Sequence, residues 1–241
     1  HDGFRYWTQD WDLAIDKFHV DNSGFAMHAD SIATPARLND PEHLVLTDVA
    51  LDAKGLVVNN ERMTVLLDSL TLRGGADSAL ITLGLGLEAT PAAIVLRNGS
   101  LQSLENTFRF DLAARPGDLE HIFRTPEAVP MEADITGDVH VEGLRRLLAQ
   151  LDAELPQGSP APERWQVKAG FKGTMRDIDH AGLVLSGDGG TRVNMSGNMH
   201  ALDRWPRSNF DLQVDELTLG TGSRALLLAQ LPAGTPLPQR L

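Results

Sequence analysis

The chain has 241 residues, of which 42% are hydrophobic and 22% charged, and its net charge is −12. This composition indicates a globular chain, organised as one large all-β domain or two smaller ones, and no apolar run is long enough to span a bilayer. The negative charge disfavours nucleic acid and anionic lipid headgroups as partners. The absence of cysteine excludes disulfides, thiolate chemistry and cysteine zinc sites.

The first predicted element is a β-hairpin over residues 17–28, KFHVDNSGFAMH. The letters DNSG at residues 21–24 are typical of a four-residue hairpin loop. If the two arms pair across this loop, one face of the hairpin receives four apolar side chains, namely Phe18, Val20, Phe25 and Met27.

A weak repeat follows along the chain. It has the pattern apolar, Asp or Thr, any, apolar, any, Leu or Val, and each copy precedes a predicted turn with the letters DNSG, DAKG, RGG or GTG. The four copies occupy residues 15–20, 46–51, 67–72 and 214–219.

The repeat predicts a bend in every copy. Its first and fourth positions are both apolar but differ in parity, so a flat strand cannot keep both on one side. A β-bulge near Asp16, Thr47, Asp68 and Asp215 would restore a common face. We therefore expect an all-β fold of curved repeat hairpins, a β-taco or half-pipe, with a flat β-sandwich as the alternative. Straight ladders through these positions would refute the bend.

The stretch ITLGLGLE at residues 81–88 alternates leucine or isoleucine with small residues. Gly84 and Gly86 form a GxG, but no third glycine and no helix start follow, so a nucleotide-binding loop is disfavoured. We interpret the stretch as a strand whose glycines let another backbone or a ligand come close.

Helices are the exception in this sequence. The spacing of leucines predicts an amphipathic helix from Leu144 to Leu155, ended by Pro156, and a short helical turn over residues 118–123. The Pro-rich stretch that follows the longer helix reads as an exposed loop. The predicted organisation is β repeats over 1–143, a helix and Pro-rich loop insertion over 144–164, a further β repeat over 165–222 and a tail over 223–241.

Enzyme and metal signatures are missing from the sequence. It contains no GxSxG, SxxK or HExxH pattern, and its carboxylates mostly sit beside glycine or asparagine, where they shape turns. Asp21 and Asp188 lack the full spacing of a calcium loop, and the histidines are scattered. We therefore expect no catalytic residues, no metal and no cofactor.

Several segments together resemble the AsmA-like superfamily, and within it the TamB proteins of the Gram-negative envelope. They are DPEHLVLTDVALDAKGL, LLDSLTLRGGADSALITLGLGLE, ADITGDVHVEGLRRL and KAGFKGTMRDIDHAGLVLSGDGGTRVNMSGNMHALDRWP, and the similarity covers most of residues 11–219. The helix at 144–155 and the Pro-rich loop depart from a plain repeat.

The resemblance implies a non-enzymatic periplasmic segment of a protein anchored in the inner membrane. Its apolar groove would shield phospholipid acyl chains in transit between membranes, or would support outer-membrane protein assembly with an outer-membrane partner. The chain begins at His1, which fits a processed or excised piece. The alternative is a secreted β-sandwich module that binds carbohydrate or protein. The expected groove residues are Leu44, Leu46, Leu56, Val58, Val65, Leu67, Ile81, Leu83, Leu85 and Leu87.

Overall fold

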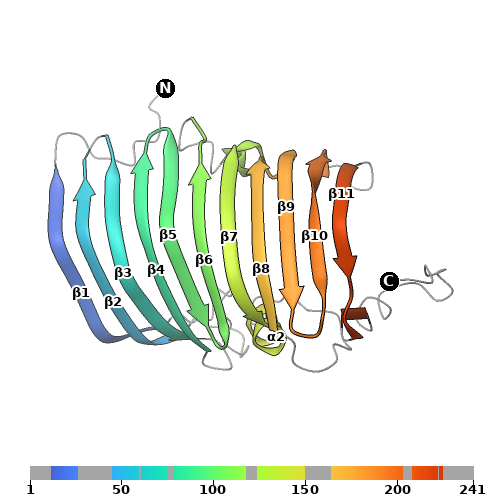
Figure 1. Cartoon of the computed structure of the whole chain (residues 1–241). Coiled ribbons are helices and arrows are strands. Elements are labelled where there is room, and N and C mark those ends of the chain that lie inside the picture. The colour runs from blue at the N-terminus through green and yellow to red at the C-terminus, as the bar shows by residue number, and fades with distance from the viewer. Residues whose placement is uncertain are drawn as a thin grey trace, which may run out of the picture.

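The structure, a computed structural model, describes residues 12–26, 45–59, 61–74, 79–117, 124–149, 164–202, 208–221 and 223–224. Its strands form a single open antiparallel sheet of eleven strands, in which the order in space follows the order in the chain (Figure 1). The strands are β1 Leu13–Ala26, β2 Val45–Val58, β3 Met63–Gly74, β4 Ala79–Thr90, β5 Ala93–Ser103, β6 Asn106–Ala114, β7 Met131–His140, β8 Arg164–Gly173, β9 Ile178–Gly187, β10 Arg192–His200 and β11 Asn209–Thr218.

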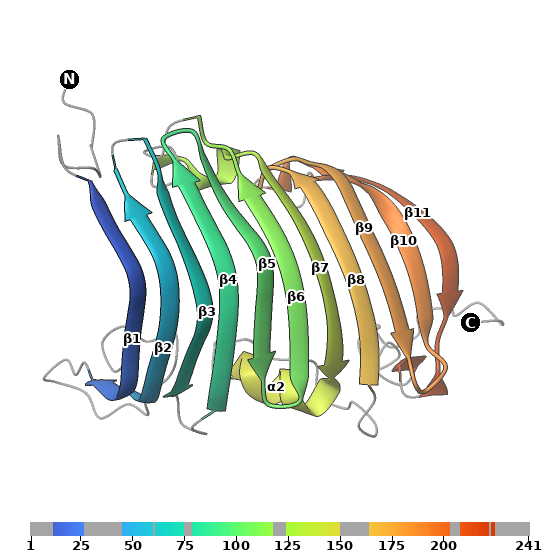
Figure 2. The same cartoon turned by 60° about the vertical axis from the view of Figure 1, so that its left-hand side comes forward.

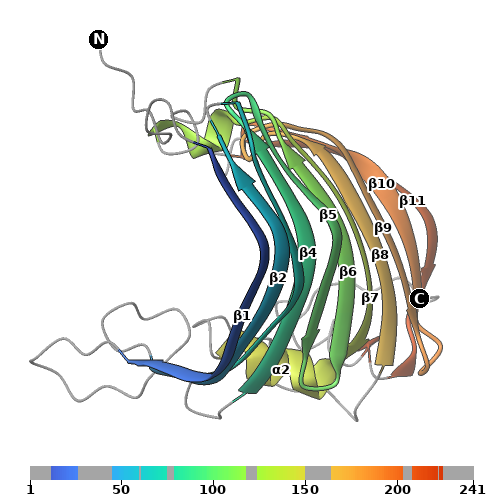
Figure 3. The ribbon, with the colours of Figure 1, turned by 90° about the vertical axis from the view of Figure 1, so that its left-hand side faces the viewer.

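The sheet is curved along its strands, which confirms the predicted half-pipe (Figure 3). Helix α2, Val141–Ala149, and the 3₁₀ turn η1, Pro126–Ala128, lie at opposite ends of the strands (Figure 2). Within the described ranges the strands make one sheet and no second sheet packs on it, so the β-sandwich alternative is wrong.

The predicted hairpin over residues 17–28 is wrong. Residues 13–26 form one strand, in which Phe18 pairs with Ala53 and Phe25 pairs with Leu46 of β2. The predicted turn is instead a register shift around Asn22, whose φ of 48° lies in the left-handed region. Asparagine tolerates that conformation in a bulge as well as in a turn. Met27 lies outside the described residues.

The DAKG turn predicted after the second repeat is also wrong, because β2 continues through it. Gly55, with φ at +60°, sits inside the strand beside a register shift against β3. Register shifts also occur where the repeat predicted bends, at or directly after Thr47, at Asp68 and at Asp215. At Asp16 the β1–β2 ladder keeps its register but lacks the Asp16–Gly55 pair, so the first copy has an irregularity at the predicted bend without a register shift.

The predicted amphipathic helix corresponds to α2, which begins at Val141 rather than at Leu144 and is described up to Ala149. The remainder of that predicted helix, the Pro-rich loop and the predicted turn at 118–123 lie outside the described residues. After the insertion, β8 pairs with β7, so one sheet continues across the predicted boundary.

Most of the buried apolar side chains lie near the two ends of the strands; Ala53, in the interior of β2, is an exception. Ala89, Ala114 and Val129 are buried at the end near η1, whereas Val139 and Val141 are buried at the end near α2. Between these ends the side chains of the sheet are mostly half-buried or exposed. This distribution is expected of a single curved layer whose ends alone are covered by loops and a helix.

Candidate functional site: the apolar face

The register of the strands collects apolar side chains on one side of the sheet, which we call the apolar face. Two rows of directly paired residues cross all eleven strands with only apolar residues and glycine. The first row is Val20, Leu51, Leu70, Leu83, Leu101, Phe108, Gly137, Val167, Leu185, Val193 and Leu217. The second is Leu13, Val58, Met63, Ala89, Ile94, Ala114, Met131, Gly173, Ile178, Met199 and Phe210.

Two shorter rows fill the space between them. From β4 to β11, Leu87, Leu96, Leu112, Ala133, Phe171, Ala181, Gly197 and Leu212 are paired in series. From β6 to β11 the corresponding series is Phe110, Ile135, Ala169, Leu183, Met195 and Val214. At ~4.8 Å per strand, the apolar face extends roughly 48 Å across the sheet.

The opposite side of the sheet, the polar face, is lined mainly by polar and charged residues. One of its rows contains Thr107, Asp138, Gln166, Ser186, Arg192 and Thr218. The alternation of an apolar and a polar face is the pattern of an antiparallel sheet that buries one side only.

The apolar face is the concave one. Gly143 of α2 lies against Asn106, since a Cβ at Gly143 would come within 2.8 Å of the Asn106 amide nitrogen. Asn106 pairs with Ser103, which pairs with Ile81 of the apolar face. Helix α2 therefore covers one end of the apolar face, and Figure 3 places α2 on the concave side of the sheet.

The groove residues predicted from the sequence lie together on this face. Leu67 pairs with Leu85, and Val65 pairs with Leu87. Leu46 pairs with Gly74, which lies two residues after Leu72, the partner of Ile81. Leu56 and Val58 pair with Ile15 and Leu13 of β1. Leu83 belongs to the first long row. Leu44 lies outside the described residues.

Bulges keep the apolar residues of β3 on one face. Leu67 and Leu70 are three residues apart, yet they pair with Leu85 and Leu83, which share a face of the straight strand β4. The register shift at Asp68 and Ser69 therefore restores the common face, as the repeat predicted.

The glycines of ITLGLGLE lie in the middle of β4, which confirms the strand interpretation. A Cβ at Gly84 would lie 3.1 Å from the carbonyl oxygen of Asp68 and 3.1 Å from Oγ of Ser100. Gly84 thus leaves room on the polar face for the bulged backbone of β3. Gly86 has only ordinary contacts at 3.6 Å or more, and nothing in its surroundings requires a glycine.

Two phenylalanines of β6 lie flat on the apolar face instead of standing up from it. The ring of Phe110 covers Gly99, where a Cβ would collide with it, and the ring of Phe108 lies 2.7 Å from a Cβ built at Gly137. Each ring thus fills the space that its paired glycine leaves empty.

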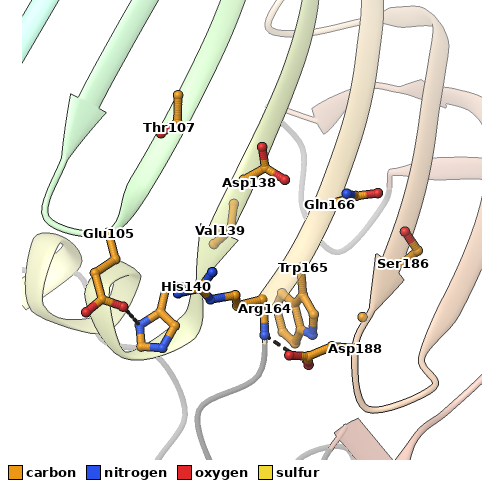
Figure 4. A pocket seen from close by; sticks show the side chains of 11 residues that line it. Glu105, Thr107, Asp138, Val139, His140, Arg164, Trp165, Gln166, Ser186 and Asp188 are labelled. Carbon is orange, nitrogen blue, oxygen red and sulfur yellow. Dashed lines mark hydrogen bonds and ion pairs between the residues drawn. The ribbon is translucent and has the colours of Figure 1, made fainter.

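A separate pocket of about 610 Å³ lies near the α2 end of the sheet and includes Asp138, Gln166 and Ser186 of the polar face (Figure 4). Three of its side chains make contacts at the strand ends: Nδ1 of His140 lies 2.9 Å from Glu105, and the backbone N–H of Arg164 donates to Asp188 at 3.1 Å. These contacts fasten strand ends to neighbouring turns. We assign the pocket a structural role.

Within the described ranges, no three His, Asp or Glu side chains gather closely enough to hold a metal ion. None of the helices in the described part of the chain has the length and apolar character needed to cross a membrane. Comparison with protein-family models, with curated proteins and with solved structures finds no match to this chain.

The sequence contains a signal for bulges that the predictions above did not use. Asn22, Asp48 and Asn98 all have positive φ inside or beside a strand, where they mark bulges rather than turns. The signal was present as Asn or Asp within an otherwise alternating apolar run, and Asn98 follows such a run directly.

Proposed function

We propose that this chain is a non-enzymatic segment of an AsmA/TamB-like envelope protein that holds phospholipid acyl chains on its apolar face. The proposal places it in the periplasm, in a parent protein anchored in the inner membrane, where lipid passes between the two membranes. The observation that carries the proposal is the pair of apolar rows that cross all eleven strands with no second sheet over them in the described part of the chain.

The energetic argument concerns the crossing of water. An acyl chain of about fifteen methylenes that is exposed to water costs on the order of 12 kcal/mol, at ~0.8 kcal/mol per CH₂. A continuous apolar surface lowers that cost at every point along its length. The negative charge of the chain does not oppose this role, because the tails contact the protein while the headgroups stay in water.

The first test is the lipid content of the purified protein. Native mass spectrometry of detergent-free preparations is expected to detect bound phospholipid, released on solvent extraction. Repeated preparations without any lipid would contradict the proposal.

The second test is a substitution in the middle of the apolar face. Leu85→Asp places a charge among Leu67, Leu83 and Leu87, so lipid photocrosslinking is expected to be lost while the circular dichroism spectrum is kept. Thr82→Asp is the matched control, because it adds the same charge to the polar face of the same strand. If Leu85→Asp unfolds the protein and Thr82→Asp does not, the apolar face is a closed core and does not bind lipid.

A related role in outer-membrane protein assembly is favoured by the edge strand β11. All of its residues are exposed, including Phe210, Leu212, Val214 and Leu217, which continue the apolar rows to the edge. In the described part of the chain β11 is the last strand of the sheet, and an edge strand of this kind can add a strand from a partner. Cysteine crosslinking between β11 and a nascent outer-membrane strand tests the role, and absence of crosslinks at every β11 position would contradict it.

A further inference from the structure

A shallow recess of about 440 Å³ lies on the polar face, on the side opposite the apolar face, across β7 to β10. Its floor contains Gly170 of β8 and Gly182 of β9, which are directly paired. Side by side, these two glycines leave the middle of two strands without side chains of their own; the carboxylate of Asp134 comes within 3.2 Å of a Cβ built at Gly170, whereas the place above Gly182 is open. Asp134 and Ser196 continue the row on either side.

The fold does not require glycine at position 182. A Cβ there would have only Nε2 of His180 within 4 Å, at 3.9 Å, and Gly182 is not among the glycines with positive φ. Glycine weakens the interior of a strand, and in that setting it marks a bulge or a place where a ligand approaches. The register is regular at the Gly170–Gly182 pair, so a bulge does not explain it.

The rim of the recess carries unpaired positive charge. Lys168 and Lys172 flank Gly170 on β8, and their Cα atoms are about 13 Å apart at ~3.3 Å per residue. His180 pairs across from Lys172. Among the described residues none of these three forms an ion pair, and neither does Asp134. Glu132, also on this side, is 3.6 Å from Arg115.

The remaining rim residues provide groups of other kinds. Val184, which is 47% exposed, is an apolar wall beside the glycine floor. Asn194 and Ser196 of β10 line the recess with an amide and a hydroxyl. The recess therefore combines a flat floor, one apolar wall, neutral hydrogen-bonding groups and two cations, and its volume is in the range of small-molecule sites.

We propose that this recess binds an acidic sugar, that is, a pyranose ring carrying a carboxylate or a phosphate. The ring lies on the glycine floor with its C–H groups against Val184, and its hydroxyls contact Asn194, Ser196 and Asp134. The acidic group is held by Lys168 or Lys172. A bare anion uses only the lysines and leaves the floor uncovered. This site is independent of lipid binding, because it lies on the other face of the sheet.

The test is a ¹⁵N–¹H NMR titration of the whole chain with four probes: glucuronate, glucose 6-phosphate, glucose and inorganic phosphate. We expect saturable shifts of the amides of Gly170 and Gly182 with at least one of the acidic sugars, and at least tenfold weaker binding of glucose and phosphate. Glucuronate and glucose 6-phosphate distinguish a carboxylate from a phosphate as the acidic group. No saturable shift with either acidic sugar, or equally tight binding of inorganic phosphate, would overturn the proposal.

Three variants refine the titration. K168Q/K172Q is expected to weaken acidic-sugar binding at least tenfold, whereas Arg109→Gln, which removes an exposed cation of β6 outside the recess, changes it less than twofold. G182A is expected to weaken binding several-fold without lowering the melting temperature, because it fills the floor and meets no neighbour. A lowered melting temperature in G182A would show that the fold needs this glycine, and would remove the argument for a ligand.

Discussion

The first half of the sheet, β1 to β6, and its central strands, β6 to β8, keep the same apolar face by different means. From β1 to β6 every ladder contains a register shift, whereas the β6–β7 and β7–β8 ladders contain none, and shifts occur again in the three ladders from β8 to β11. In Figure 3, β1 and β2 kink near their middle, while β8 curves smoothly. The comparison indicates that local kinks are built into the first half by extra residues, and that the central strands need only strict alternation.

Polar contacts accompany the bulges of the first half. Nε of Arg73 donates to Asp48 at 2.9 Å, Nζ of Lys54 lies 2.9 Å from Asp68, and the backbone N–H of Asn98 donates to Asp111 at 2.8 Å. Each contact joins a bulge to a neighbouring strand. Two features therefore determine the position of each bulge: the parity of the apolar residues around it and a polar contact to the neighbouring strand.

The largest contrast is expected from single-residue deletions. Deletion of Thr136 in the regular strand β7 moves Val139 to the polar face and Asp138 onto the apolar face, so we expect a loss of more than about 4 kcal/mol or complete unfolding. Deletion of Asn98 leaves Leu96 and Leu101 with matching parity in a straight strand. We therefore expect the free energy of unfolding to fall by only about 1–3 kcal/mol. Urea denaturation followed by circular dichroism measures both. Equal losses would contradict the difference between the bulged and the regular strands.

The next contrast uses two glycines, Gly137 of β7 and Gly182 of β9. In Gly137→Val, the new Cβ lies 2.7 Å from the Phe108 ring and 2.9 Å from the Thr107 carbonyl oxygen, so we expect a loss of about 1–3 kcal/mol by overpacking. Gly182→Ala meets open space and is expected to gain up to about 1 kcal/mol. Thermal unfolding of the two variants measures the difference. A stabilised Gly137→Val would show that Phe108 does not depend on the glycine beneath it.

The sequence predicts the strands, the single apolar face and three of the bends, because alternation and its parity are local properties. It does not distinguish the bulge at Asn22 from a hairpin turn, since positive φ at Asn serves both structures. The distinction depends on Val49 and Leu51 of β2, which pair with Ser23 and Val20 and are far away in the chain. The Gly170–Gly182 recess also depends on register between strands, so neither glycine alone indicates it.

A smaller effect is expected from the acceptor that holds the Asn98 bulge. Asp111→Ala removes the oxygen that accepts the Asn98 N–H, at a cost of about 0.5–1.5 kcal/mol. Asp134→Ala is the control, because Asp134 pairs directly with Asp111 across β6 and β7 and the two like charges repel each other. We expect Asp134→Ala to raise the free energy of unfolding by about 0.2–0.5 kcal/mol. Chemical denaturation resolves these opposite signs, and a loss in both variants would contradict the assignment.

The smallest effect is expected for the ion pair at the Asp68 bulge. Lys54 and Asp68 are 53% and 44% exposed, so a double-mutant cycle of Lys54→Met and Asp68→Asn is expected to give a coupling of at most ~1 kcal/mol that shrinks as salt is raised. Parity alone then keeps Leu67 and Leu70 on one face. A coupling well above that value, unchanged by salt, would mean that the charge pair itself forms the bulge. The same cycle at Asp48 and Arg73 would then be expected to behave alike, because that pair also joins a bulge to its neighbouring strand.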